Sequence, residues 1–305
     1  MIVSGGEALV DLVPDPVPGG GPMNVAIAAT RLGVTSAFLG RVSTDAYGEQ
    51  IWAHLVANGV DLRLTERGDE PTARAIVEHT PKLQFRFEGE GTADQALSSA
   101  SLAPLGRGPH ILHGGTLGLF RGRTAEVLAD AAERHDGIVS LDPNVRPQII
   151  DDRARWDHFH DRWVVRTHLY RGSDEDFDWI WPGRSAEDCA DELLARGVLA
   201  VMVTRGPEGA LVLTGDGHVR VPGVAVEVVD TVGAGDTFVA GVLASLSARG
   251  LSGDPAALTA LTGADWADIA GFGARAAAVT CSRPGADPPT AADLGVEPLG
   301  GSNPQ

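Results

Sequence analysis

The most informative stretch of this 305-residue chain reads VVDTVGAGDTFVAG, from Val228 to Gly241. An apolar run meets a glycine-rich turn there, and a helical pattern follows directly. Small residues let backbone N–H groups approach an anion closely, and a helix N-terminus adds about half a positive charge at the same place. The stretch therefore predicts a phosphoryl-binding turn at Gly233, Ala234 and Gly235.

Asp236 follows this turn and falls in the first turn of the predicted helix. A carboxylate in that place can accept the proton of a hydroxyl group that attacks a phosphate in line. The structural alternative is an aspartate that caps a helix behind a tight turn, which is common for a lone Gly-x-Gly-Asp. The residues of the turn by themselves leave both interpretations open.

The rest of the chain alternates strand and helix patterns. Apolar residues at helical spacing run from Pro22 to Leu32 and from Tyr47 to Asn58, and each run ends at a glycine. We expect strands at 34–39, 111–113, 138–142, 164–170, 200–204 and 210–214, and further helices at 124–135 and 185–196. This alternation predicts an α/β fold, a mostly parallel sheet with helices on both faces, in which ligands bind beyond the carboxyl ends of the strands.

The first segment of the chain begins this alternation, and two other segments are expected to lie outside the sheet. Residues 2–13 have an extended pattern, and Pro14, Pro16 and Pro18 should end any continuation of it. The stretches 73–78 and 83–87 flank a Thr80-Pro81 turn and predict a hairpin in a separate small sheet. The tail, residues 300–305, is expected to be disordered.

Composition excludes several classes of function. A net charge of −17 argues against a nucleic-acid or anionic-membrane surface. No window approaches the roughly 18 apolar residues that span a bilayer, so a soluble cytoplasmic protein is expected. Cys189 and Cys281 lie far apart without metal-ligand spacing, so we interpret both as buried thiols rather than a disulfide or a zinc site.

Basic side chains give a narrower constraint. Lys82 is the only lysine, so phosphate groups must be held by arginines, metal ions and backbone amides. No Gly-x-x-x-x-Gly-Lys-Ser/Thr motif occurs, and the first strand is not followed by Gly-x-Gly-x-x-Gly. P-loop enzymes, protein kinases and dinucleotide-binding dehydrogenases are therefore disfavoured.

The whole segment from Asp230 to Phe238 resembles the second signature of the ribokinase-like (PfkB) carbohydrate kinases, Asp-Thr-x-Gly-Ala-Gly-Asp-x-Phe. The resemblance implies a ribokinase-like fold and an ATP-dependent sugar kinase. It also assigns roles to the segment: Asp236 as the base, Gly233, Ala234 and Gly235 as the anion hole, Thr231 at the nucleotide, and Asp230 at a monovalent cation such as K⁺.

The resemblance extends to the sugar side. The run GGGPMNVA from Gly19 resembles the first region of the family, GEALVD from Gly6 resembles the opening of fructokinase-like members, and DPNVR from Asp142 resembles the family's DPNxR. Glycines let the backbone lie against a sugar, and asparagine can donate and accept toward vicinal hydroxyls. The implied substrate-binding residues are Asp11, Gly19, Gly20, Asn24 and Arg146.

The nucleotide side is matched more loosely. The run SDED from Ser173 stands where the family has NxxE, which implies that Asp176 organises Mg²⁺ through water, with Ser173 in place of the asparagine. TRGPEGA from Thr204 resembles the nucleotide loop VTxGxxG, which implicates Thr204, Gly206 and Gly209. Residues 272–278 and 282–286 resemble the helix and loop that enclose adenine, which implicates Ala278.

Departures from the family bear on the substrate. The run EGEGTAD from Glu88 resembles the fructokinase-like YREGTAD, but Glu88 and Gly89 replace the tyrosine and the arginine. A carboxylate substrate such as 2-keto-3-deoxygluconate needs a cation, and although Arg86 lies nearby, this loss favours fructose or another neutral sugar. A ribokinase or nucleoside kinase, and a sugar- or nucleotide-binding protein without catalysis, remain the alternatives.

We expect one kinase domain at 1–299, with a β lid at about 8–20 and 72–93. The segment between Asp11 and Gly19 is shorter than in most relatives. A reduced lid leaves open whether two copies of the chain form a homodimer through it.

Overall fold

A nine-stranded sheet forms the centre of the computed structural model, which describes residues 1–13, 15–78, 84–106 and 108–300. The strands follow the order β13-β12-β11-β10-β9-β8-β1-β4-β5. All neighbours from β5 to β11 run parallel, whereas β12 and β13 add an antiparallel edge. The bounds are β1 Ile2–Gly5, β4 Ser36–Ser43, β5 Thr65–Gly68, β8 Ile111–Gly115, β9 Ile138–Asp142, β10 Leu169–Ser173, β11 Ala200–Thr204, β12 Gly209–Thr214 and β13 Gly217–Pro222.

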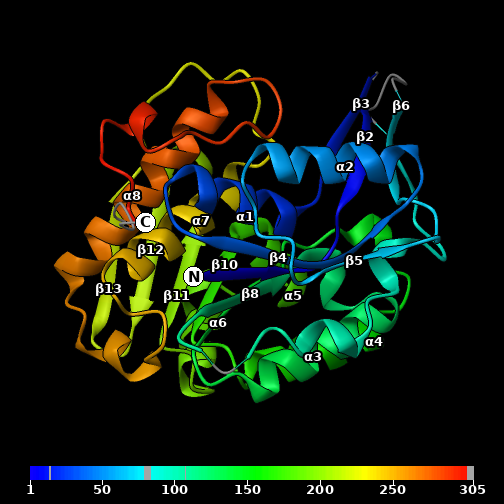
Figure 1. Ribbon diagram of the computed structural model, residues 1–305. Helices are drawn as coiled ribbons and strands as arrows, with labels where there is room; N and C mark the ends of the chain where they lie inside the picture. Colours follow the sequence, from blue (N-terminus) through cyan, green and yellow to red (C-terminus); the bar gives the residue numbers. More distant parts are fainter. Residues whose placement is uncertain (14, 79–83, 107, 301–305) are drawn as a thin grey trace.

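Helices cover both faces of this sheet (Figure 1), because its central strands are buried on both sides. One apolar core lies between the sheet and α3 (Gly122–Arg134), α4 (Arg153–Val164), α5 (Asp174–Ile180) and α6 (Ala186–Ala195). The other lies beneath α1 (Gly21–Arg31), α7 (Ala234–Ala248) and α8 (Gly263–Cys281), and α2 (Ala46–Ala57) packs beside α1. The predicted α/β architecture is confirmed.

A four-stranded sheet in the order β3-β2-β6-β7 stands apart from the main sheet, at the upper right of Figure 1. Its strands are β2 Leu9–Val13, β3 Asp15–Gly19, β6 Arg74–Glu78 and β7 Gln84–Glu88. The pairing of β2 with β6 joins segments that are far apart along the chain. The predicted Thr80-Pro81 turn and Lys82 lie outside the described residues.

The prediction that the prolines end the extended segment is wrong for Pro16 and Pro18, which both lie within β3. This strand is an edge strand, paired on one side with β2. An edge strand tolerates proline because its outward-facing positions need no N–H donor. Pro14 lies outside the described residues.

The predicted and observed boundaries of the elements agree best in the central strands. The structure places β9 and β11 at the predicted residues, but the strand expected from 164 begins at Leu169, because α4 extends to Val164. The run expected to be extended and apolar before the glycine-rich turn is not a strand, and Val228 and Val229 are exposed. β5 and β13 were not predicted.

Three further expectations concern the cysteines, the C-terminal tail and membrane-spanning segments. Cys189 is buried as expected, whereas Cys281 is only partly buried at the end of α8. Of the tail, Gly300 donates its N–H to the carbonyl of Gly33 at 3.1 Å, and residues 301–305 lie outside the described part. Over the described residues, the structure contains no helix with the length and apolar character needed to cross a bilayer.

Candidate active site

The glycine-rich turn forms the start of α7, as predicted. Gly233 is the N-cap residue with φ of 75°, a left-handed conformation that glycine adopts without strain. The N–H of Ala234 donates to the carbonyl of Thr231 at 3.2 Å. Since the first N–H groups of a helix lack intrahelical acceptors, those of Gly235 and Asp236 are the donors best placed for an anion.

Asp236 is buried in the first turn of α7 and is held from a distant part of the chain. The side-chain amide of Asn24, in α1, donates to Asp236 Oδ2 at 2.8 Å. A Cβ atom at Gly21 would lie 2.7 Å from Thr116 Oγ1 and 3.3 Å from Asp236 Oδ1. The close packing at Gly21 thus brings together the start of α1, the turn after β8 and the start of α7.

Burial raises the pKa of Asp236, and three groups oppose that shift: the amide of Asn24, then the charges of Arg146 and Arg171. A carboxylate whose pKa is raised toward neutrality is better matched to accept a proton from a hydroxyl group than an ordinary aspartate. The position and the electrostatics of Asp236 both suit a general base.

The predicted sugar residues gather in the same place. Asp11 lies on β2, and a Cβ atom at Gly19 would lie 2.5 Å from its carboxylate. Burial raises the pKa of Asp11 to about 6, and the charge of Arg146 opposes the shift. Because Arg146 also lowers the pKa of Asp236, these three side chains face one region.

Gly20 lies between β3 of the small sheet and the start of α1. Its φ is 121°, and a Cβ atom there would lie 2.7 Å from the carbonyl oxygen of Glu7. Residues with side chains rarely adopt this conformation, and the space is also closed. The close approach explains why a glycine stands at this predicted sugar contact.

Two further residues near Asp236 and Gly21 had not been assigned a role from the sequence. Glu7 is fully buried and accepts hydrogen bonds from the N–H groups of Gly21 at 3.2 Å and Gly118 at 3.0 Å. Burial raises the pKa of Glu7 to about 8 despite these donors. Thr116 has φ of 48°, a strained conformation for a β-branched residue and typical of functional sites.

Asp176 connects two of the predicted motifs. Its Oδ1 accepts the N–H of Val145 at 2.6 Å, and its Oδ2 accepts the N–H and hydroxyl of Ser173 at 2.8 and 2.7 Å. These bonds form a capping box at α5 and fix the DPNVR loop. The described residues contain no group of three or more acidic, histidine or cysteine side chains that could hold a metal ion.

The predicted nucleotide loop is a tight turn after β11. Gly206 has φ of 50° and Gly209 has φ of 95°, and a Cβ atom at Gly209 would lie 2.1 Å from a backbone oxygen. Thr204 at the end of β11 accepts a hydrogen bond from Arg171 Nη2 at 2.5 Å. Arg171 was not predicted from the sequence, although an arginine inside a buried parallel strand is an uncommon feature.

Asp230 joins the loop before α7 to the loop after α8. Its Oδ1 accepts the N–H of Val232 at 3.0 Å, and its Oδ2 accepts the N–H of Gly285 at 2.9 Å. Thr231 is exposed beside it, and Ala278 is buried on α8. These two loops, both predicted to contact the nucleotide, are thus held together.

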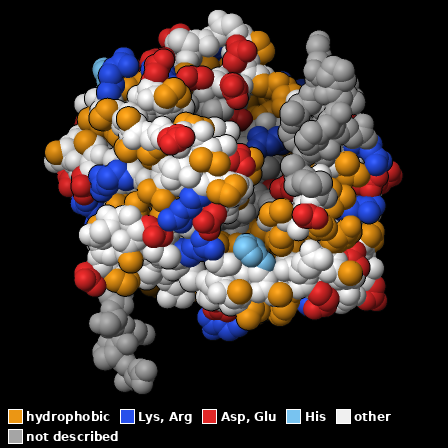
Figure 2. All heavy atoms as spheres, turned by 90° about the horizontal axis from the view of Figure 1, so that it is seen from above, with side chains coloured by type: hydrophobic (Ala, Val, Ile, Leu, Met, Phe, Trp, Pro, Cys, Tyr) orange, Lys and Arg blue, Asp and Glu red, His pale blue; other side chains and the backbone are white. Residues whose placement is uncertain are grey.

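The segment before α7 carries exposed apolar side chains. It is the yellow arch at the top of Figure 1, and the surface seen from that side has a hollow with charged side chains near it (Figure 2). Such a group of exposed branched side chains is unusual on a monomer surface and typical of a ligand or protein contact. The exposed valines are Val224, Val226, Val228, Val229 and Val232.

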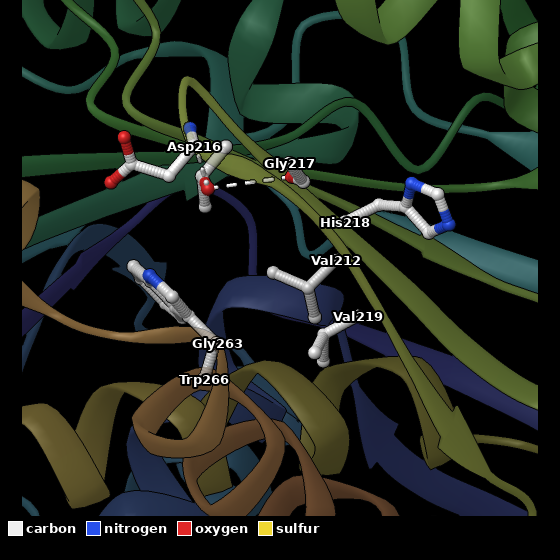
Figure 3. Close-up of a pocket in the computed structure, with 8 residues that line it drawn as sticks. Val212, Asp216, Gly217, His218, Val219, Gly263 and Trp266 are labelled. Carbon is white, nitrogen blue, oxygen red and sulfur yellow. Dashed lines mark hydrogen bonds between the residues drawn. The ribbon is translucent and has the colours of Figure 1, made fainter.

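Two surface pockets are lined by residues other than Asp236 and its partners. One of about 360 Å³ opens beside the nucleotide loop, where Arg205 and Glu208 form part of its wall. The other, of about 70 Å³, lies between the β12–β13 hairpin and Trp266 of α8 (Figure 3). Since Thr214 in its wall pairs with Ala200 at the start of β11, the smaller pocket lies at the opposite edge of the sheet from Asp236.

Known proteins resemble this chain over most of its length. The family model described as "pfkB family carbohydrate kinase" matches residues 15–293. A fructokinase of Rhizobium leguminosarum bv. trifolii is 37% identical over 260 residues, which cover 81% of this chain and 79% of the relative.

Solved structures of a sugar kinase and a riboside kinase are also similar to this chain. The structure of a fructokinase from Vibrio cholerae O395 with fructose, ADP and calcium has a TM-score of 0.81 at 28% identity, and the match covers 93% of this chain and 94% of that one. An aminoimidazole riboside kinase from Salmonella enterica, complexed with its riboside and an ATP analog, has a TM-score of 0.82 at 26% identity, with the same coverage.

Proposed function

Because this chain belongs to the pfkB family of carbohydrate kinases and is an ATP-dependent, fructokinase-like sugar kinase, we propose that its acceptor is fructose. The observation that carries this function is the buried Asp236 carboxylate beside the N–H donors of α7, held by Asn24 at 2.8 Å. A hydroxyl group and a phosphoryl group can meet only where a base and an anion hole adjoin.

In the proposed reaction, Asp11, Gly19, Gly20 and Asn24 orient the sugar, with Arg146 at the edge of the cavity. Asp236 accepts the proton of a primary hydroxyl as that oxygen attacks the γ-phosphate. The N–H groups at the turn, those of Gly235 and Asp236 first, stabilise the charge on the transferred phosphoryl group. Positioning and electrostatics accomplish the transfer without a covalent intermediate.

A neutral sugar fits the region around Gly89. A Cβ atom at Gly89 would lie 2.1 Å from the ring of Phe87 and 2.7 Å from Arg121 Nη1, so these two side chains fill the space of the missing side chain. Arg121 is paired with the buried carboxylate of Asp94 at 3.5 Å and donates to the carbonyl of Gly89. A guanidinium already neutralised in this way is a poor partner for a substrate carboxylate, which supports fructose over 2-keto-3-deoxygluconate.

The nucleotide is proposed to lie across the start of α7. Exposed valines of residues 224–232 offer an apolar surface for a purine, next to Ala278 of α8. Thr204, Gly206, Gly209, Ser173 and Thr231 are proposed to surround the ribose and phosphates. The 360 Å³ pocket beside the nucleotide loop lies next to this region.

The ions are part of the same proposal. Both oxygens of Asp176 already accept protein hydrogen bonds, which fits Mg²⁺ held through water rather than directly. Bound Mg²⁺ would neutralise charge on the phosphates. Asp230 is proposed to hold a monovalent cation, which a fructokinase structure with a bound potassium ion supports.

The test is a coupled ADP-release assay with ATP and Mg²⁺, comparing fructose with 2-keto-3-deoxygluconate, ribose and aminoimidazole riboside. We expect the highest kcat/KM with fructose. A higher kcat/KM with the riboside would replace the proposed acceptor with a nucleoside, and ATP binding without turnover of any acceptor would indicate a binding protein. Size-exclusion chromatography with light scattering addresses the homodimer.

A further inference from the structure

Arg171 is the one arginine that is buried among the described residues, with 8% of its surface exposed. It lies on β10, in the middle of a parallel sheet where strands are normally apolar throughout. Burying a charge is costly unless it is paired and hydrogen-bonded. An arginine kept in this place therefore calls for an explanation beyond packing.

The guanidinium of Arg171 connects its own strand, β10, to three other segments. Its Nη1 pairs with Asp142 Oδ2 at 2.8 Å at the end of β9, and its Nη2 donates to Thr204 Oγ1 at 2.5 Å at the end of β11. A Cβ atom at Gly235 would lie 2.8 Å from Nη1, so the guanidinium packs directly against the anion-binding turn. Its buried Nε finds no acceptor among the described residues.

The charges around the turn show what this guanidinium adds. Three carboxylates act on Arg171, those of Asp142, Asp176 and Asp236, and outweigh the burial that lowers its pKa. On the fourth side lies the N-terminus of α7, itself positive by about half a charge. Without Arg171, the negative charge of the three carboxylates would outweigh this positive half charge. The net negative charge would repel a polyanionic nucleotide.

We propose that Arg171 is a positioning residue that supplies the buried positive charge of the anion hole and holds the turn at Gly235 against Thr204. The inference rests on the proposed function, since it takes the phosphates of ATP as the anion. Arg171 acts through the turn and through the local field, and its charge favours binding of the phosphates and of the transferred phosphoryl group.

The competing explanation is that Arg171 serves only as the counter-ion of Asp142. In that case Arg171→Met would harm the enzyme by leaving a buried carboxylate unpaired, and removing that charge as well would restore it. The double variant Arg171→Met with Asp142→Asn separates the two explanations, because it removes both partners of this ion pair. Arg171→Lys keeps a charge at this site but loses the planar fork.

We expect Arg171→Met to lower kcat by about tenfold to about a hundredfold, toward the loss seen when a hole donor is removed. ATP should bind more weakly to the variant, whereas adenosine, which lacks phosphates, should bind as before in calorimetry. The double variant should stay impaired in both respects, and Arg171→Lys should recover part of kcat. Arg162→Met, which removes an arginine paired with three carboxylates of α3, controls for lost ion pairs.

The pH profile gives a readout that a purely structural role would not change. Arg171 lowers the pKa of Asp236, and so do Asn24 and Arg146. Asp142 and Asp176 also face the guanidinium, as does the neutral ring of His113, whose pKa is lowered to about 3 by burial and by Arg171. Losing Arg171 should therefore move the acidic limb of kcat/KM to higher pH.

The outcomes are separable. Recovery of kcat and ATP affinity in the double variant, or equal weakening of ATP and adenosine by Arg171→Met, would overturn the inference. An inactive wild-type enzyme would instead contradict the proposed function, while the comparison of ATP with adenosine would still decide the role of Arg171. If Arg171→Met does not fold, the double variant and Arg171→Lys provide the same comparison.

Discussion

Replacing Asn24 with leucine removes the side-chain donor to Asp236 and keeps a side chain that branches at Cγ. That donor lies 2.8 Å from Asp236 Oδ2, and it is the largest of the contributions that lower the pKa of Asp236 against burial. A hydrogen bond to a charged group contributes about 1.5 to about 3 kcal/mol, and one pKa unit corresponds to about 1.4 kcal/mol. Losing this donor should therefore destabilise the ionised carboxylate by about 1.5 to about 3 kcal/mol and raise the pKa of Asp236 in Asn24→Leu.

The sign of the effect on activity follows from the chemistry. A general base works when it is ionised, so activity is present above its pKa and is lost below it. A higher pKa therefore moves the acidic limb of the profile of kcat/KM against pH to higher pH. Activity at high pH should recover toward a plateau that also reflects weaker sugar binding.

The assay is the coupled ADP-release reaction, followed across the pH range in which the enzyme stays folded. Asn58→Leu is the matched control, because Asn58 donates to the carbonyl of His54 at the end of α2, outside the cavity. The control should leave the acidic limb in place. An unshifted limb in Asn24→Leu, with activity reduced equally at all pH values, would refute the role of Asn24 in setting the pKa of Asp236.

Three further predictions concern residues of the proposed active site. Gly235→Ala should lower kcat by about tenfold or more, because its Cβ would lie 2.8 Å from the Arg171 guanidinium, whereas Gly215→Ala, with open space around it, should leave kcat unchanged. Burial raises the pKa of Glu7 from 4.5 to about 8, so native Glu7 keeps a proton that the unfolded chain releases. Urea unfolding should thus show wild-type stability falling with pH across that window, by up to about 1.4 kcal/mol per unit, and Glu7→Gln should flatten the slope. Asp230→Ala should raise the KM for ATP and abolish any activation by KCl, and unchanged KCl dependence would remove Asp230 from the cation site.

Sequence reasoning succeeded where the local pattern and the tertiary environment agree. The central strands at 138–142 and 200–204 are continuous apolar runs, as strands buried on both faces must be, and their bounds are confirmed. The glycine-rich turn also folds as predicted, because Gly233 requires a left-handed backbone and the helix begins directly after it. Asp236 and Asn24, placed at one site from separate motifs, are hydrogen-bonded.

Other features were missed, either because charged residues dominate the segment or because the partners lie far apart along the chain. The amphipathic spacing of Trp156, Phe159 and Trp163 in α4 was hidden among charged residues. Arg171 and Glu7 carry their roles through partners that are distant along the chain, such as Gly235 and Gly118. A charged residue inside an apolar strand was the available signal for Arg171, but its partners could be named only once the strand order was known.

The central claim is that the carboxylate of Asp236 accepts the proton of the sugar. Asp236→Asn keeps the shape of the side chain and removes its basicity, so kcat should fall by about a hundredfold or more, while calorimetry should show ATP bound nearly as tightly as by the wild type. Turnover close to that of the wild-type enzyme in Asp236→Asn would contradict the account.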